Sequence, residues 1–124
     1  MKTKQTSRIL VDTNIVIRAL IDDNDIFQKL VENSDEVHIP LPVFFEIVFV
    51  LEKIHRQTRI TIVDYLSTVI SYENIITEND TLKEVMEIYL NNTNLSVIDC
   101  FLLIYADKNK VELKTLDKSL AKAA

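Results

Sequence analysis

Residues 8–14, which read RILVDTN, decide the expected fold. A short apolar run ends at Asp12, and this is typical of a buried strand that gives way to a helix. Open α/β sheets place their ligands at the carboxyl ends of the strands, which is where Asp12 falls. Asp12 is equally suited to cap the next helix. The stretch therefore predicts a strand of a parallel sheet, followed by a carboxylate that either binds a ligand or caps a helix.

Outward from this stretch, strand-like and helix-like segments alternate. We expect strands at residues 8–11, 37–39 and 111–115, with a brief strand or connector at 75–76. Helical spacing covers residues 14–20, 25–31, 42–55, 60–71, 81–90, 96–108 and 118–123. This alternation predicts an α/β fold in three layers, with a central parallel sheet of about four strands flanked by helices. A length of 124 residues predicts one domain over residues 1–124.

The composition limits which cellular compartment and which binding partners are expected. The single cysteine, Cys100, excludes an internal disulfide and suits a reducing cytosol; we expect it to lie in the core. No apolar stretch of signal-peptide or membrane-spanning length follows the basic start at residues 1–4, so we expect a cytoplasmic protein without membrane contact. The net charge of −5 is acidic for a protein that binds a polyanion. A nucleic-acid partner therefore requires bound cations or clustered basic residues.

The chain contains no glycine. A P-loop, a GxGxxG dinucleotide loop, a GxSxG nucleophile elbow and an EF-hand loop each need glycine at fixed positions. An HExxH zinc motif is excluded as well, because neither His38 nor His55 has the required partners. The site designs that remain are those built from carboxylates.

Glu46 is the only charged residue in the apolar stretch 43–51. Burying an unpaired carboxylate is costly, so such a group becomes neutral or binds a cation. The alternative is a carboxylate that reaches solvent or pairs with a distant Lys or Arg. No local base is available, because its neighbours three and four positions away are Pro42, Val43, Phe49 and Val50.

Two further acids occupy comparable places. Asp99 is the only acid between Val97 and Ala106 in another apolar helix, although Ser96 and Asp99 also fit a capping box. Asp117 follows the last expected strand and equally fits a helix N-cap. We expect Asn109 to end the apolar helix in a left-handed conformation, in place of glycine.

Taken together, Asp12, Glu46, Asp99 and Asp117 form a pattern. One acid follows the first strand, one follows the last, and two lie in apolar helices that would cover the sheet. Clustered carboxylates repel one another unless a cation holds them. A site of oxygen ligands, without Cys or His, suits Mg²⁺ or Mn²⁺.

These residues resemble the PIN-domain ribonucleases, the fold of VapC-type toxins in toxin–antitoxin pairs. The matching stretches are LVDTN at 10–14, PVFFE at 42–46, VID at 97–99 with its apolar helix, and KTLD at 114–117. They fall in the family's order and spacing and cover nearly the whole chain. The resemblance implies Mg²⁺- or Mn²⁺-dependent cleavage of phosphodiester bonds in single-stranded RNA.

By the same resemblance, Asp12, Glu46 and Asp99 would hold the metal, with Asp117 assisting or binding a second ion. Asn14 and Thr115 match positions that support the site. Family members often have a further strand after the last acid, whereas this chain stops at Ala124. We therefore expect a homodimer held by apolar helix faces, and an antitoxin protein as inhibitor.

The basic residues leave two interpretations open. Lys53, Arg56 and Arg59 near one helix end could follow the RNA backbone, or they could form an ordinary solvated face.

The same residues are compatible with two rival functions. A catalytically silent PIN-like binding module would keep the acids for stability or docking. A phosphoryl-transfer enzyme with Asp12 as nucleophile fits less well, because the haloacid-dehalogenase motif DxDxT requires Asp where this chain has Asn14.

Overall fold

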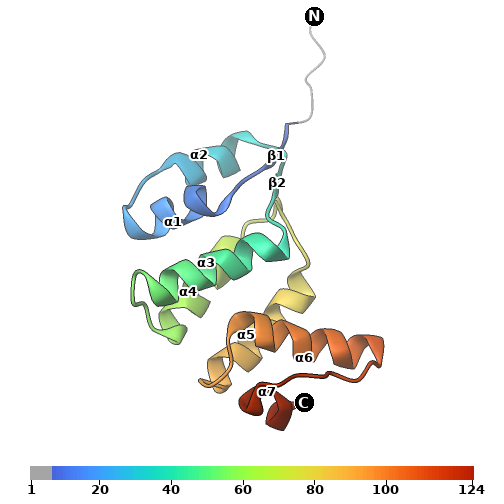
Figure 1. The fold of residues 1–124 in the computed structure, drawn as a ribbon. Coiled ribbons are helices and arrows are strands. Elements are labelled where there is room, and N and C mark those ends of the chain that lie inside the picture. The colour runs from blue at the N-terminus through green and yellow to red at the C-terminus, as the bar shows by residue number, and fades with distance from the viewer. Residues whose placement is uncertain (1–6) are drawn as a thin grey trace, which may run out of the picture. The chain divides into compact units, whose positions relative to one another are not determined.

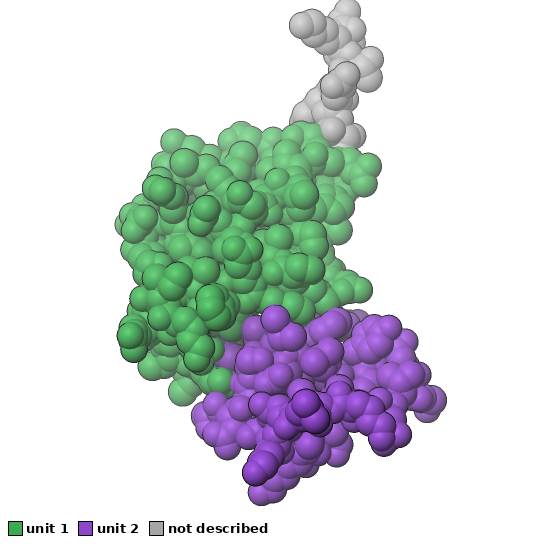
Figure 2. Space-filling view, in the orientation of Figure 1, with its two compact units in different colours: residues 1–78 green, residues 79–124 purple. Residues whose placement is uncertain are grey.

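The structure, a computed structural model, describes residues 7–124, so the basic start at residues 1–4 lies outside the described residues. The chain divides into two compact units, residues 1–78 and 79–124, coloured green and purple in Figure 2. We call them unit 1 and unit 2 and describe each by itself. None of the helices within residues 7–124 is both long and apolar enough to cross a membrane.

Unit 1 is built on a three-stranded parallel sheet, and Figure 1 labels its strands β1 and β2. The strands are β1 (Arg8–Leu10), β2 (Glu36–His38) and β3 (Ile75–Ile76), in the order β1-β2-β3. Ile9 lies opposite Val37, and Val37 lies opposite Ile75. Val37 and Ile75 are buried, so this face of the sheet belongs to the core.

Four helices form the connections of unit 1. α1 (Thr13–Ile21) and α2 (Ile26–Asn33) join β1 to β2, and α3 (Leu41–Lys53) and α4 (Arg59–Ile70) join β2 to β3. Parallel crossovers are nearly always right-handed, so two crossovers that run in the same direction place their helices on the same face. α1 contacts α2 and α3, and α3 contacts α4. The fully buried side chains of these helices are Val16, Phe44, Ile47, Val48, Leu51, Ile62 and Leu66.

Unit 2 is helical. α5 (Asn79–Asn91) packs against α6 (Val97–Asn109), and the short α7 (Lys118–Ala123) follows. The ammonium of Lys108, near the end of α6, donates to Oγ1 of Thr81 in the first turn of α5 at 3.1 Å, so the two helices run antiparallel. The core of the unit includes Leu82, Val85, Met86, Tyr89, Val97, Cys100 and Leu120. The expected core position of Cys100 is confirmed.

The structure confirms an α/β fold with a parallel sheet flanked by helices, but the sheet has three strands instead of about four. The prediction of a strand at 111–115 is wrong. The amide of Val111 donates to the Ala106 carbonyl at the end of α6, and the Val111 side chain is 53% exposed. Alternating side chains predict an extended backbone, but a strand also needs a neighbour with which to pair.

The absence of glycine is visible where helices end. The left-handed residue after α6 is Lys110, with φ at 53°, one position later than the predicted Asn109. Its amide donates to the carbonyls of Ala106 and Asp107 and so closes the helix. Asp23 and Arg56 also have positive φ within the described residues. Residues other than glycine are uncommon in this conformation, and bulky residues such as Arg56 are especially so.

Candidate functional site

Asp12 lies just beyond the carboxyl end of β1 and is the N-cap of α1. Its Oδ1 accepts a hydrogen bond from the Ile15 amide at 3.4 Å, and the residue is exposed. Within residues 7–124 its Oδ2 has no hydrogen-bond partner. The two readings of Asp12 from the sequence are therefore compatible, because the cap occupies only one of its oxygens.

Glu46 is fixed from another element. The hydroxyl of Thr13, the first residue of α1, donates to Oε2 of Glu46 in α3 at 2.9 Å. Thr13 is 6% exposed and is the one polar residue counted as buried within residues 7–124. Because Thr13 directly follows Asp12, this bond places Glu46 beside the residue next to Asp12, the other predicted site acid of unit 1.

The inference that Glu46 is buried is wrong. Glu46 is exposed, although its Thr13 contact is partly buried. A helix that is apolar nearly all round does not reveal from sequence which side is left uncovered. The carboxylate therefore reaches solvent, as the alternative reading expected, while Oε2 stays bound to Thr13.

Asp99 completes the capping box that the sequence predicts at the start of α6. The Ser96 amide donates to Oδ2 of Asp99 at 3.0 Å, and the Asp99 amide donates to Oγ of Ser96 at 3.1 Å. Asp99 is half-buried. Its Oδ1 has no hydrogen-bond partner in the described part of the chain.

Asp117 is the N-cap of α7, with Oδ1 accepting from the Leu120 amide at 2.8 Å. The Asp117 amide in turn donates to Oγ1 of Thr115 at 3.0 Å. Thr115 thus shapes the turn that presents the carboxylate. Leu116, between them, is fully exposed.

Three of the four acids share a position in their helices, and all four lack a basic partner. Asp12, Asp99 and Asp117 stand at helix N-termini, where backbone amides and the helix dipole favour a negative charge. Across residues 7–124, none of the four carboxylates forms an ion pair with Lys, Arg or His. Their hydrogen-bond partners are amides and one hydroxyl. The donor set therefore consists of carboxylate oxygens whose charge no base offsets, which fits a hard divalent cation.

Each unit contributes two of these acids, Asp12 and Glu46 in unit 1 and Asp99 and Asp117 in unit 2. In the described part of the chain, no three His, Cys, Asp or Glu side chains are grouped closely enough to hold a metal ion. The meeting of all four acids stays a prediction.

Two other predicted site features are local. Asn14 is exposed on α1, and its side chain makes no hydrogen bond to any residue in the described range 7–124. Of the basic residues, Lys53 and Arg56 are exposed, whereas the Arg59 side chain is only 16% exposed and lies 3.5 Å from Glu52.

An apolar groove of about 550 Å³ borders Asp12 in unit 1. It lies between the end of β1 and the starts of α1 and α3. Its lining residues are Ile9, Leu10, Val11, Asp12, Ile15, Leu30, Pro40 and Val43.

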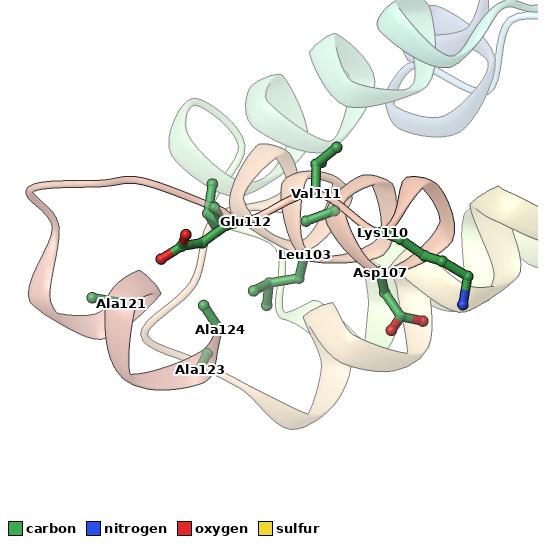
Figure 3. Close-up of a pocket in the computed structure, with 10 residues that line it drawn as sticks. Leu103, Asp107, Lys110, Val111, Glu112, Ala121, Ala123 and Ala124 are labelled. Carbon is green, nitrogen blue, oxygen red and sulfur yellow. The ribbon is translucent and has the colours of Figure 1, made fainter.

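A separate cavity of about 700 Å³ lies within unit 2 and contains none of the predicted site residues (Figure 3). It is bordered by the end of α6, the segment after it and α7. Leu103 and Ala121 line its apolar part, and Asp107 and Lys110 lie together at one end.

A polar cluster on the sheet was not foreseen from the sequence. Oε1 of Glu36 lies 2.7 Å from Nε2 of His38 and 3.2 Å from Nε of Arg8. The hydrogen bond with His38, followed by that with Arg8, lowers the pKa of the Glu36 carboxyl below its ordinary value. Arg8 and Glu36 are register partners, so the cluster ties β1 to β2.

The comparison with protein families matches the PIN domain over residues 9–124, a range that includes all four acids. The chain therefore belongs to the PIN-domain family. PIN domains are generally metal-dependent nucleases that bind divalent ions such as Mg²⁺. No curated protein matches the chain.

Proposed function

We propose that this PIN domain is an Mg²⁺- or Mn²⁺-dependent endoribonuclease that cleaves single-stranded RNA. The observation that carries the proposal is the set of four carboxylates that are oriented by hydrogen bonds but neutralised by no base. Family membership supports nuclease chemistry in general, and the choice of RNA follows from the motif resemblance.

In this proposal Asp12, Glu46 and Asp99 hold the metal, and Asp117 assists or holds a second ion. When bound, the ion would supply Lewis-acid chemistry, activating a water molecule and offsetting the negative charge that develops on the phosphate oxygens. Thr13 fixes the Glu46 carboxylate, and the caps restrict the rotamers of Asp12, Asp99 and Asp117 before any ion arrives. Such preorganisation lowers the cost of assembling the site.

The direct test is cleavage of a labelled single-stranded RNA with Mn²⁺, with Mg²⁺ and with EDTA. We expect cleavage with either metal and none with EDTA. Cleavage by an Asp12→Asn, Asp99→Asn double variant at the wild-type rate would overturn the proposal, provided that the preparation is free of contaminating nuclease.

A second candidate, the catalytically silent binding module, is favoured by one observation. Asp12, Asp99 and Asp117 all have structural duties as caps, so they could persist without catalysis. Metal distinguishes the two functions, because a silent module would give the same thermal melt with Mn²⁺ and with EDTA. A protein with a nuclease metal site should have a higher melting temperature with metal than with EDTA. Metal at a hundredfold excess over its dissociation constant should raise the free energy of unfolding by about 2.7 kcal/mol.

We further propose that the protein acts in the cytoplasm as the toxin of a toxin–antitoxin pair. An antitoxin would inhibit it by placing a basic side chain, Arg for preference, among the acids. The gene next to this one tests the idea. We expect it to be a small, overlapping open reading frame that encodes a protein with a DNA-binding N-terminus.

We propose α6 as the contact of a homodimer. Ile98 and Tyr105, seven positions apart and therefore on one stripe of the helix, are 55% and 52% exposed. Light scattering should give a dimer for the wild type at micromolar concentration and a monomer for an Ile98→Glu, Tyr105→Glu variant. A wild-type monomer would remove the dimer proposal.

A further inference from the structure

The outer side of α3 presents an exposed stripe that includes a predicted metal ligand. Pro42, Glu46, Phe49 and Lys53 are all exposed and follow one another at spacings of four, three and four residues. Such spacings place side chains on one face of a helix. The opposite face is fully buried, with Phe44, Ile47, Val48 and Leu51 in the core of unit 1. We call the exposed residues 42, 46, 49 and 53 the α3 stripe.

Phe49 is the unusual member of the α3 stripe. It is 57% exposed, whereas Phe27 and Phe44 are buried and Phe45 and Phe101 are half-buried. An exposed aromatic ring offers a flat apolar surface to a ligand, and nucleobases stack on such rings whatever their sequence. The ring lies one helical turn from the exposed carboxylate of Glu46.

Positive charge lies at the end of the α3 stripe. The Lys53 side chain is 63% exposed and approaches Glu52 only at 3.9 Å. Arg56 is exposed on the turn after α3 and forms no ion pair within residues 7–124. Arg59 differs, because its largely covered side chain pairs with Glu52. Two of the three predicted basic residues are thus positioned to meet phosphate.

We propose that the α3 stripe binds single-stranded nucleic acid, with one nucleobase stacked on Phe49 and backbone phosphates at Lys53 and Arg56. The inference rests on the proposed ribonuclease function, since it leads the strand past Glu46. With a rise of about 1.5 Å per residue, Phe49 lies about 4.5 Å and Lys53 about 10.5 Å along the helix axis from Glu46. A strand that advances at least about 3.4 Å per nucleotide covers this distance in three nucleotides or fewer.

Charge favours nucleic acid over a second copy of this chain as the occupant. The chain carries a net charge of −5, yet Lys53 at the end of the α3 stripe and Arg56 on the turn after it are both exposed cations. Backbone phosphates are complementary in charge to both cations, so a nucleic-acid strand gains an attraction that an apolar surface lacks.

The chain has no tryptophan, so Phe49→Trp creates a unique fluorescent probe at the ring position. We expect its emission to be quenched when single-stranded oligouridylate is added in EDTA. Ile26→Trp, at a 46% exposed position in α2, is the matched control and should keep its emission. Equal quenching of both probes, or of neither, would overturn the proposal.

Affinity for the same oligonucleotide, measured in EDTA by fluorescence anisotropy, tests the role of the ring. Phe49→Leu keeps an apolar side chain but removes the ring, and it should weaken binding roughly 5- to 150-fold. Phe49→Tyr should bind like the wild type. Wild-type affinity in Phe49→Leu would contradict the proposal. So would a loss of dimer in that variant with RNA affinity unchanged, since the ring would then belong to a self-interface.

The phosphate contacts need variants that spare the fold. Arg56 has φ at 55°, which glycine adopts freely, so Arg56→Gly removes the charge without straining the turn. Arg56→Gly and Lys53→Ala should each reduce the slope of log affinity against log salt by about 0.7. An unchanged slope in both variants would contradict this part of the proposal.

These measurements are made without metal, so they are independent of cleavage. A protein that binds through Phe49 but cleaves nothing with Mn²⁺ would support the stripe and overturn the nuclease proposal. A protein that cleaves RNA with Mn²⁺, and whose RNA affinity is unchanged by Phe49→Leu, would support the nuclease proposal and overturn the proposed role of the α3 stripe.

Discussion

In unit 1 the hydroxyl of Thr13 in α1 binds Glu46, 33 positions further along the chain, whereas in unit 2 Asp99 and Asp117 bind only groups within three residues of themselves. Glu46 is therefore oriented by tertiary packing, since α1 and α3 must be in contact for the bond to form, whereas Asp12 in the same unit is oriented by its local cap. The acids of unit 2 are oriented by helix starts alone. Local caps can form before or without the rest of the fold, so Glu46 should respond to substitution differently from Asp12, Asp99 and Asp117.

The largest effect is expected from removing one charge in each unit. Asp12→Asn and Asp99→Asn should each lower Mn²⁺-dependent cleavage by about 10²- to 10⁴-fold, because a metal ligand contributes several kcal/mol to transition-state stabilisation. Asn caps a helix about as well as Asp, so Asp12→Asn should keep its melting temperature in EDTA. Steady-state cleavage rates and thermal melts on the same samples check both statements. Wild-type cleavage in either variant would remove that acid from the site.

The next effect should be confined to unit 1. Thr13→Val removes the hydroxyl that orients Glu46, and the loss of one hydrogen bond should cost about 0.5–1.5 kcal/mol of stability. Cleavage should fall by roughly 10- to 100-fold, because a small displacement of a site group is costly. Thr13→Ser keeps the hydroxyl and serves as the control. Equal cleavage by the valine and serine variants would show that the bond has no part in the activity.

These two predictions reflect how much the sequence could foresee. The caps at Asp12, Ser96–Asp99 and Asp117 were expected because a cap is specified by residues three positions apart. The bond from Thr13 to Glu46 was not predicted, because Thr13 directly precedes the helix expected at residues 14–20 and fits a helix cap as well as any other role. Nothing local in the sequence identifies a partner 33 positions away.

The errors have the same origin. Glu46 is exposed because packing, and not the apolar run around it, decides which side of α3 is covered. Residues 111–115 have the composition of a strand, but strand formation depends on a pairing partner that the segment itself does not specify. The parallel sheet and its helices were predictable because alternation of strands and helices along the chain is a local signal.

A smaller effect should be confined to unit 2. Asp117→Ala loses the cap of α7 and should cost about 1 kcal/mol, whereas Asp117→Asn should be nearly neutral. Protection of the α7 amides in hydrogen exchange is the suitable readout, because α7 is only six residues long. Equal loss of protection in the alanine and asparagine variants would mean that charge, and not capping geometry, holds this helix.

The smallest effect concerns Glu36, which is not one of the four predicted site acids. Its pKa in the folded protein is lowered from 4.5, chiefly by the hydrogen bond with His38 and then by Arg8. A lowered pKa stabilises the fold above the unfolded-state value, and that contribution is lost as the pH falls through the folded-state pKa. Glu36→Gln should therefore flatten the loss of stability below about pH 4.5, measured by urea unfolding across pH. An unchanged acid limb would show that the cluster does not stabilise unit 1.

Calorimetric titration with Mn²⁺ tests the proposal that Glu46 and Asp99 bind the same metal ion. The proteins to compare are the wild type, Glu46→Gln from unit 1 and Asp99→Asn from unit 2. Glutamine can still accept the Thr13 hydrogen bond, so Glu46→Gln removes charge and little else. Both variants are expected to weaken the same Mn²⁺ binding event. Two separate binding events, with each variant weakening a different one, would contradict a common metal ion. So would a titration that neither variant changes.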